Sequence, residues 1–138
     1  MQTALLERGV VDPAEAEAHL RRASELLARL KTDARWRELD AADRHHEVPY
    51  SLVQGERPVN GFIDLLYCGP DSHWRIIDFK TDVIVDEAGL EKLLEEGYRR
   101  QLQRYQAAVL TLLGQPTQII LCLLDYAGGV QWKLVGGF

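Results

Sequence analysis

The sequence has little cysteine and no long apolar stretch, and both absences narrow what the protein can be. Its 138 residues include two cysteines, Cys68 and Cys122. Two are too few for an all-cysteine zinc or iron–sulfur site, so we expect no iron–sulfur cluster. No apolar run approaches the roughly 20 residues that a membrane-spanning helix needs, so we also expect no membrane partner.

A secretion signal is missing as well. The first residues, MQTALLERGVVDPAEAEAH, contain no basic segment followed by an apolar one. We therefore expect a cytoplasmic protein. In that compartment the two cysteines are expected to be reduced thiols, with a disulfide between them as the alternative.

An excess of positive charge is also lacking, since the formal net charge is −5. This balance argues against a free-standing protein that binds nucleic acid tightly and nonspecifically, because such proteins are normally basic. It does not exclude an active site that holds a phosphate through metal ions. It does indicate that any strong binding of DNA would come from elsewhere, such as a larger parent protein. The length and composition are those of one globular domain, 1–138.

The first part of the chain, 1–42, is predicted to be helical, ahead of a mixed core over 43–138. Asp12 and Pro13 are typical of a helix start, and apolar residues then recur at helical spacing up to residue 30. A second short helix is predicted over 34–41, with Thr32 and Asp33 as its cap.

The core is predicted to contain three antiparallel strands, a helix and two further strands. Turn residues separate the first three strands, as is typical of a meander. The helix has a polar first part, which we expect to be loosely held, and a second part with a firm apolar stripe. The strand after it is apolar on both faces, which indicates a central position. The predicted ranges are 47–53, 59–67 and 74–81 for the meander, 87–96 and 97–113 for the helix, and 117–124 and 130–135 for the last strands.

The histidines do not indicate a metal site. Residues 43–46, DRHH, are predicted to form a polar turn. His45 and His46 are adjacent, so in a strand they could not both face one site. We interpret them as surface or nucleic-acid-facing residues, and His19 as a surface residue of the first helix. A metal or catalytic role is the alternative for each.

The stretch over 60–82 carries a high density of charge for two buried strands. It reads NGFIDLLYCGPDSHWRIIDFKTD, with Asp64 in one strand and Asp78 and Lys80 in the next. Residues two apart share a face of a strand, so Asp78 and Lys80 lie together, and a hairpin brings Asp64 close to Asp78. Two carboxylates and an ammonium are costly in a plain core. They are suited to holding a divalent cation against a phosphate.

A second polar group lies on the predicted helix. Gln101 and Tyr105 are four residues apart, so they stand on one helix face. If this helix packs beside the meander, Gln101 can contact a metal-bound water or a phosphate oxygen. Tyr105 can hydrogen-bond a phosphate or stack on a base. The alternative is that Tyr105 is a core residue and Gln101 is solvated.

Three motifs, GFID over 61–64, DFKT over 78–81 and QLQRY over 101–105, occur in an order and spacing that resemble a known family. The chain resembles the RecB-like branch of the PD-(D/E)XK nuclease superfamily, as found at the C-terminus of UvrD-, RecB- and AddA-type helicases. The resemblance covers about residues 47–125. It implies an α/β (α+β) fold with a restriction-endonuclease-like core. In that core a mixed β-sheet contains an antiparallel three-stranded meander and is flanked by helices.

The resemblance also implies a function. It implies Mg²⁺- or Mn²⁺-dependent, exonuclease-type hydrolysis of DNA in a bacterial helicase–nuclease of DNA repair or recombination, associated with the nucleoid. The substrate would be single-stranded DNA ends delivered by a helicase domain or subunit. Asp64, Asp78 and the backbone carbonyl of Phe79 are the implied metal ligands. The implied catalytic residues are Asp64, Asp78, Lys80, Gln101 and Tyr105.

Further residues have smaller implied roles. Lys80 would position the attacking water or stabilise charge on the phosphate in the transition state. In this branch an acidic residue before a proline and an aromatic recurs in the first strand, which makes Glu47 a candidate accessory residue. Arg99, Arg100 and Arg104 lie around the QLQRY helix, and Arg100 and Arg104 are candidates for phosphate contacts. The alternative is that these arginines form a solvated helix face.

One feature of the family is not found. Members usually carry a histidine of the metal site on a helix upstream of the sheet, after a Gly-Thr pair, and His19 stands in a different context. Because Met1 leads directly into a helical stretch, we interpret the chain as a fragment of a larger helicase–nuclease. Two alternatives to an active nuclease stay open. One is a catalytically incomplete nuclease-fold module with a structural or DNA-guiding role. The other is a small α/β interaction domain whose acidic pair is surface charge.

Overall fold

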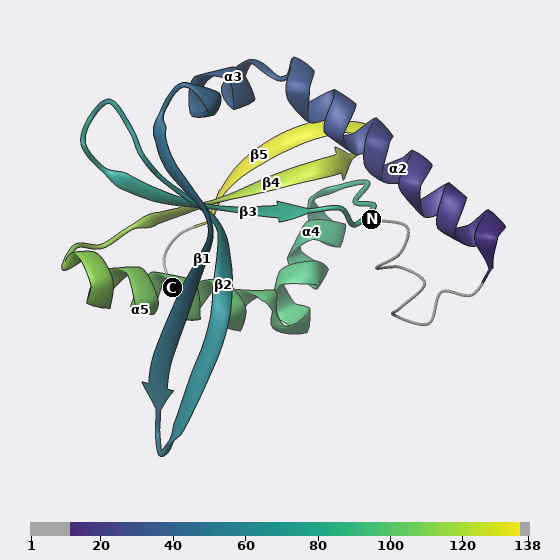
Figure 1. Ribbon diagram of the computed structural model, residues 1–138. Helices are drawn as coiled ribbons and strands as arrows, with labels where there is room; N and C mark the ends of the chain where they lie inside the picture. Colours follow the sequence, from purple (N-terminus) through teal and green to yellow (C-terminus); the bar gives the residue numbers. More distant parts are fainter. Residues whose placement is uncertain (1–11, 136–138) are drawn as a thin grey trace.

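One mixed β-sheet forms the centre of the computed structural model, which describes residues 12–135. The strands are β1 (Asp43–Gln54), β2 (Arg57–Cys68), β3 (Trp74–Lys80), β4 (Gln118–Tyr126) and β5 (Gly129–Val135). They lie side by side in chain order (Figure 1). All neighbours are antiparallel except β3 and β4, which are parallel. The predicted mixed sheet with its antiparallel three-stranded meander is therefore confirmed.

Helices cover both faces of this sheet (Figure 1). On one face lie α2 (Pro13–Thr32) and α3 (Ala34–Asp40). On the other lie α4 (Glu87–Leu93), the π-helical segment η1 (Leu94–Tyr98) and α5 (Arg99–Leu113). The second group also forms the crossover that two parallel strands such as β3 and β4 require.

Each face of the sheet has its own apolar core. The core under α5 includes Ile63, Leu66, Ile76, Leu90, Leu94, Leu102, Tyr105, Val109, Ile119, Leu121 and Leu123. The core under α2 and α3 includes Leu26, Leu30, Leu39, Leu65, Tyr67, Ile77, Ile120, Cys122 and Leu124. The alternation of β4 between these two cores explains why its sequence is almost continuously apolar.

The predicted helix limits agree with the structure to within two residues, because the capping residues behave as expected. Asp12 accepts a hydrogen bond from the N–H of Ala14 at 3.0 Å, and Pro13 is the first helical residue of α2. At the end of α5, Gly114 takes the left-handed conformation, with φ 70°. Its N–H donates to the carbonyl of Leu110 at 2.9 Å.

Two arginines of α2 tie this helix to the C-terminal ends of β3 and β4. Arg22 donates to the carbonyl of Thr81 at 2.6 Å and pairs with the carboxylate of Asp125 at 3.0 Å. Arg29 donates to the carbonyl of Leu124 at 3.1 Å and lies 3.5 Å from the second carboxylate oxygen of Asp125. The hydrogen bond from Arg22 is the main reason why the pKa of Asp125 is lowered.

The joint between α4 and α5 lies at Gly97. Its φ of 121° and ψ of −14° are outside the helical region and are strained for any residue with a side chain. The expectation that the first part of this helix is loosely held is wrong. Leu90 and Leu94 are buried, and Asp86 caps α4 through a 2.8 Å hydrogen bond from the N–H of Gly89.

The polar turn predicted over 43–46 is also wrong, because these residues extend β1 and pair with the end of β2. Their side chains find aromatic partners on both sides of the sheet. The ring of His45 stacks on Trp74 with centroids 5.9 Å apart, and the guanidinium of Arg44 lies 5.7 Å from the centre of the Trp36 ring. Polar residues therefore continue the strand through contacts that the local sequence does not indicate.

Two further findings concern the membrane and the cysteines. Within residues 12–135 no helix has the length and apolar character needed to cross a bilayer. Cys68, which is partly buried, and Cys122, which is fully buried, are both free thiols, as expected. Burial raises the pKa of Cys122 to about 12.

Asp33 offers a test of how α3 is joined to β5. Its Oδ1 atom accepts hydrogen bonds from the N–H groups of Arg35 at 2.9 Å and Trp36 at 3.2 Å, and from the indole N–H of Trp132 at 3.0 Å. We expect Asp33→Ala to lower the free energy of unfolding by about 3 kcal/mol, because a helix cap is lost and a partly buried indole loses its acceptor. Asp12→Ala removes only a cap and should cost about 1 kcal/mol. Urea denaturation of both variants measures the difference, and equal losses would contradict the contribution of Trp132.

Candidate active site

β2 and β3 separate at the point where two aspartates would face each other. Their ladder ends at the pair Leu65–Ile77. One residue further on, Oδ2 of Asp64 accepts a hydrogen bond from the backbone N–H of Phe79 at 2.9 Å, where a strand-to-strand bond would otherwise lie. This bond satisfies a backbone donor that the separation would leave without a partner. It also brings the carboxylate of Asp64 close to that of Asp78, as the sequence predicts. This proximity adds to the effect of burial in raising the pKa of Asp78.

An irregularity in β1 accompanies this separation. The register of β1 and β2 places Glu47 across from Asp64, and Glu47 has a positive φ of 49°, which is uncommon for a residue other than glycine. In β2, Ile63 belongs to the core under α5 and Leu65 to the core under α2 and α3, although residues two apart normally share a face. The sheet faces to which the side chains of β2 point are therefore exchanged at Asp64. The side chain of Asp64 extends to β3, where it accepts the hydrogen bond from Phe79.

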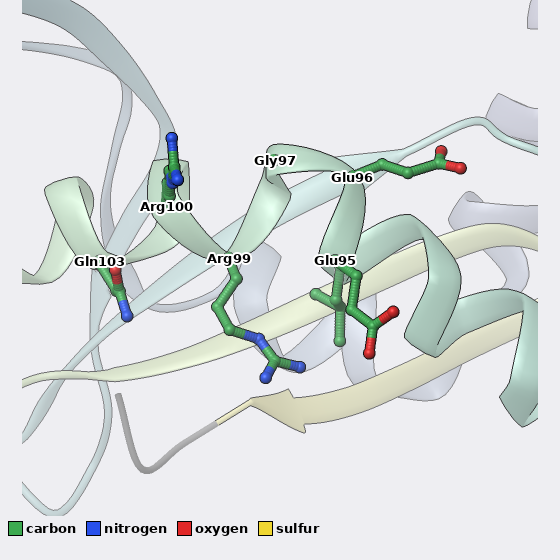
Figure 2. Close-up of a pocket in the computed structure, with 7 residues that line it drawn as sticks. Glu95, Glu96, Gly97, Arg99, Arg100 and Gln103 are labelled. Carbon is green, nitrogen blue, oxygen red and sulfur yellow. The ribbon is translucent and has the colours of Figure 1, made fainter.

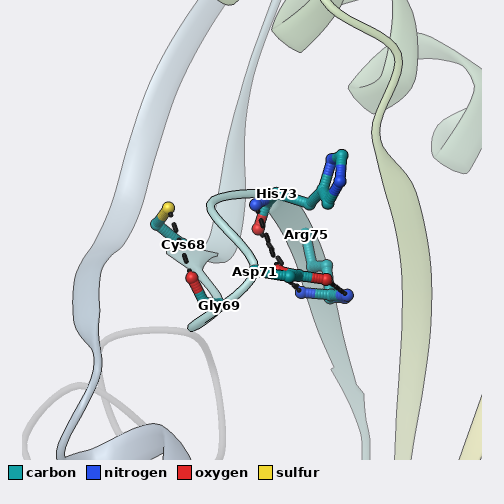
Figure 3. Close-up of polar contacts among 5 residues, drawn as sticks. All are labelled: Cys68, Gly69, Asp71, His73 and Arg75. Carbon is teal, nitrogen blue, oxygen red and sulfur yellow. Dashed lines mark hydrogen bonds and ion pairs between the residues drawn. The ribbon is translucent and has the colours of Figure 1, made fainter.

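The turn between β2 and β3 sets the register that brings the two aspartates together (Figure 3). Asp71 accepts hydrogen bonds from the N–H of His73 at 3.1 Å and from Arg75 at 3.0 and 2.6 Å. These contacts, with Arg75 the strongest, hold the pKa of Asp71 well below its usual range. Cys68 adds a 3.7 Å hydrogen bond from its thiol to the carbonyl of Gly69.

Asp78 and Lys80 form a buried ion pair on the face that α5 covers, as their spacing predicts. Asp78 is 1% exposed and Lys80 8%, and Nζ of Lys80 lies 2.8 Å from Oδ2 of Asp78. That oxygen has no hydrogen bond of good geometry to the residues that the structure describes, so the contact is ionic. Burial raises the pKa of Asp78 to about 6, against the opposing effect of Lys80 and with a contribution from Asp64.

Tyr98, the last residue of η1, closes over Lys80. The ammonium nitrogen lies 3.4 Å from the centre of the tyrosine ring, which is a cation–π contact. Burial lowers the pKa of Lys80, but the contacts with Asp78 and Tyr98 outweigh it, and the pKa stays above its ordinary value. Tyr98 is not among the site residues predicted from the sequence. Its position seven residues before Tyr105, or two helical turns, is the signal that could have placed it on the same face.

The structure also brings Tyr105 near the aspartates. Tyr105 is 3% exposed and belongs to the core under α5, and its pKa is raised by burial and by the charges of Asp78 and Asp64. The alternative made from the sequence, a core residue, therefore applies to Tyr105, which also borders the acidic pair. Gln101, one turn before Tyr105, is partly exposed.

Gly61 allows β1 and β2 to support Tyr105. Tyr50 is the cross-strand partner of Gly61 and lies across it, so a Cβ atom at Gly61 would be 2.5 Å from the hydroxyl of Tyr50. The ring of Tyr50 then meets Tyr105 edge to face, with centroids 5.6 Å apart and planes at 76°. The glycine of the GFID motif thus has a packing reason in this chain.

Two of the three arginines around the QLQRY helix, Arg99 and Arg100, line a surface hollow. Arg99 and Arg100 point to different sides of the helix at the joint between η1 and α5 (Figure 2). There they border a surface hollow of about 630 Å³, in which neither aspartate takes part. Arg99 pairs with Glu91 at 2.8 Å, and Arg104 is partly buried. The hollow is lined by Leu94, Glu95, Glu96, Gly97, Arg99, Arg100 and Gln103.

The donor atoms at the separation of β2 and β3 suit a hard divalent cation. Asp64 and Asp78 offer carboxylate oxygens, one of which is buried without a hydrogen bond, and the backbone of Phe79 lies beside Asp64. Mg²⁺ commonly takes one or two carboxylates and keeps several waters, so this set fits it. Among residues 12–135 no group of three or more His, Cys, Asp or Glu side chains is arranged to hold a metal. Glu47 is exposed and is not brought into such a group.

A comparison with protein-family models decides the family. The model described as the PD-(D/E)XK nuclease superfamily matches residues 2–134. The chain belongs to the PD-(D/E)XK nuclease superfamily. None of the curated proteins matches the sequence. The mixed sheet flanked by helices is consistent with the restriction-endonuclease-like fold of this superfamily.

Gly61→Ala tests the contact that holds Tyr50 against Tyr105. We expect the free energy of unfolding to fall by about 2 kcal/mol, because the new methyl group overlaps the ring of Tyr50. Gly89→Ala is the control: its Cβ would lie 3.4 Å from the nearest atom, within α4, and should leave the stability unchanged or slightly higher. Thermal denaturation compares the two variants, and a Gly61→Ala protein as stable as the native protein would contradict the packing described.

The raised pKa of Asp78 predicts how stability depends on pH in the absence of divalent cations. Because its folded pKa of about 6 exceeds the ordinary value of 3.8, the folded state binds a proton between these values that the unfolded state does not. The stability contributed by Asp78 is therefore complete below about pH 4 and is lost as the pH rises through about 6. The free energy of unfolding of the native protein, minus that of Asp78→Asn, should therefore decrease as the pH rises from about 4 through about 6. Urea denaturation in EDTA measures it, and a difference that rises with pH would contradict the assignment.

Proposed function

We propose that the protein is a divalent-metal-dependent DNA nuclease of the RecB-like branch, which cleaves phosphodiesters in the exonuclease manner. The observation that carries this proposal is the convergence of Asp64, Asp78 and Lys80 where β2 and β3 separate, in a chain of the PD-(D/E)XK nuclease superfamily. Superfamily membership supports nuclease activity on DNA. The finer assignment is supported by the GFID, DFKT and QLQRY motifs.

Asp64 and Asp78 would hold a Mg²⁺ or Mn²⁺ ion together with the carbonyl of Phe79. A cation bound there supplies a lowered pKa for a coordinated water and offsets negative charge on the scissile phosphate. The hydrogen bond from the N–H of Phe79 orients Asp64 before any ligand binds. The buried oxygen of Asp78 lies beside the lysine ammonium, has no hydrogen-bond partner among the described residues and can accept a further partner.

Lys80, Gln101 and Tyr105 would act on the water and the phosphate. An ammonium group has three N–H donors, so Lys80 can keep its contact with Asp78 and still donate to an attacking water or to a phosphate oxygen. Gln101 and Tyr105, which are one helical turn apart on α5, would orient the water or the DNA backbone. Arg100 and Arg104 would contact phosphates further along the strand, and Glu47 would be an accessory acid.

We further propose that residues 1–138 form a single nuclease domain of a helicase–nuclease in DNA repair or recombination. Its helical part would be 1–42 and its nuclease core 43–138, of which 1–11 and 136–138 lie outside the described residues. The net charge of −5 supports such a partner, because a helicase that delivers single-stranded ends would supply the grip on DNA that an acidic domain lacks.

A second candidate is a nuclease-fold module that is catalytically incomplete and guides DNA or supports its neighbours. Two observations favour it. The upstream histidine of the family's metal site has no counterpart in the sequence. In the part of the chain that the structure describes, no cluster of three metal-binding side chains occurs.

Cleavage assays test the proposed function directly. We expect the 138-residue chain to shorten a fluorescent single-stranded DNA in Mg²⁺ or Mn²⁺, and Asp78→Asn and Lys80→Ala each to lower kcat by about a thousandfold. Asp43→Asn, which changes an exposed carboxylate of the same sheet, is the matched control and should cleave as the native protein does. Cleavage retained in both the Asp78 and the Lys80 variants would contradict the proposed nuclease function.

Metal binding separates the proposed function from its alternatives. Mn²⁺ should raise the Tm of the native protein by mass action and leave the Tm of Asp64→Asn nearly unchanged. A raised Tm without cleavage would favour the incomplete module. A native Tm that does not respond to Mn²⁺ would favour an interaction domain whose acidic pair has no ligand.

A further inference from the structure

The ammonium group of Lys80 is held from two directions, and only one of them belongs to a motif recognised in the sequence. The carboxylate of Asp78 lies 2.8 Å from Nζ, and the ring of Tyr98 lies 3.4 Å from it. We propose that Tyr98 is a positioning residue, whose ring face fixes the ammonium of Lys80 for the reaction. This inference rests on the proposed function of the site and adds to it a residue outside the three motifs.

A lysine needs such a contact more than most residues do. Its four-carbon stem gives the ammonium many rotamers, and the ion pair alone restrains it at one point. The ammonium has three N–H donors, and the contacts with Asp78 and with Tyr98 need no more than one each, so a donor stays available for a water or a phosphate oxygen. Tyr98 therefore restrains the ammonium of Lys80 without using its donors on another carboxylate.

The backbone explains how Tyr98 reaches this place. Tyr98 follows Gly97 directly and ends η1, where the kink at Gly97 joins α4 to α5. A Cβ atom at Gly97 would meet nothing within 4 Å, so its φ of 121° is the reason for glycine there, and not lack of space. The turn at Gly97 thus sets the position of the ring above β3.

A purely structural role is the competing account, because Tyr98 also packs against the core under α5. The two accounts differ in what they require of the side chain. A structural role needs apolar volume, which leucine largely supplies. A positioning role needs a ring face, which phenylalanine keeps and leucine does not. Tyr98→Phe and Tyr98→Leu therefore form the decisive pair of variants.

The first readout does not depend on activity. The chain has four lysines, Lys31, Lys80, Lys92 and Lys133, so the ammonium nitrogen of Lys80 can be assigned by NMR in protein labelled with ¹⁵N at lysine. We expect this nitrogen to be ordered in the native protein and in Tyr98→Phe, and mobile in Tyr98→Leu. Tyr126→Leu is the matched control. Tyr126 lies 5.5 Å from the ammonium of Lys133, so this change should affect Lys133 and leave Lys80 ordered.

The second readout is the cleavage of the same fluorescent single-stranded DNA. We expect Tyr98→Leu to lower kcat by about tenfold with KM within about twofold, and Tyr98→Phe to retain most of kcat. Lys80 equally ordered in Tyr98→Leu would overturn the inference, and so would a loss of kcat that is the same in Tyr98→Phe and Tyr98→Leu. If the native chain does not cleave DNA, the proposed function fails, and the NMR comparison still decides whether Tyr98 holds Lys80.

Discussion

The hydrogen bond from the backbone N–H of Phe79 to the carboxylate of Asp64 is the constraint on which the rest of the site depends. A strand that leaves its neighbour exposes backbone groups, and a buried N–H without a partner is costly. Asp64 removes that cost by accepting the bond itself. β2 can then part from β3 inside the sheet, and the carboxylate is held at the point of separation. The same atoms therefore serve the fold and the proposed metal site.

Charge buried at this separation works against stability. Asp78 and Lys80 are almost wholly enclosed, and a buried ion pair often contributes less than apolar residues of the same size would. The raised pKa of Asp78 reflects this cost, since burial and the nearby Asp64 both disfavour its ionised form. Two apolar cores, one on each face of the sheet, offset it. An arrangement that is unfavourable by itself but well supported is typical of a functional site.

Aromatic side chains from distant elements pack against Tyr105 and Lys80 near the separation of β2 and β3. Tyr50 from β1 supports Tyr105 on α5, and Tyr98 from the π-helical segment covers Lys80. On the other side of the sheet, Arg22 holds the end of β3 through the carbonyl of Thr81. The groups of the proposed active site are thus restrained from both faces, which suits chemistry that depends on position more than on movement.

The sequence by itself determined the local features of this protein. The caps at Asp12 and Gly114, the meander, and the shared face of Asp78 and Lys80 all follow from residue types and from the period of a helix or a strand. Superfamily membership follows from the sequence too, since it is encoded in the order of the residues.

Only the tertiary structure decided where β2 and β3 separate and how the side chains of β2 exchange faces at Asp64. It also decided that residues 43–46 extend β1 and that Tyr98 covers Lys80. Each of these features depends on contacts between residues far apart in the chain. Periodicity and capping act over a few residues and are blind to such contacts.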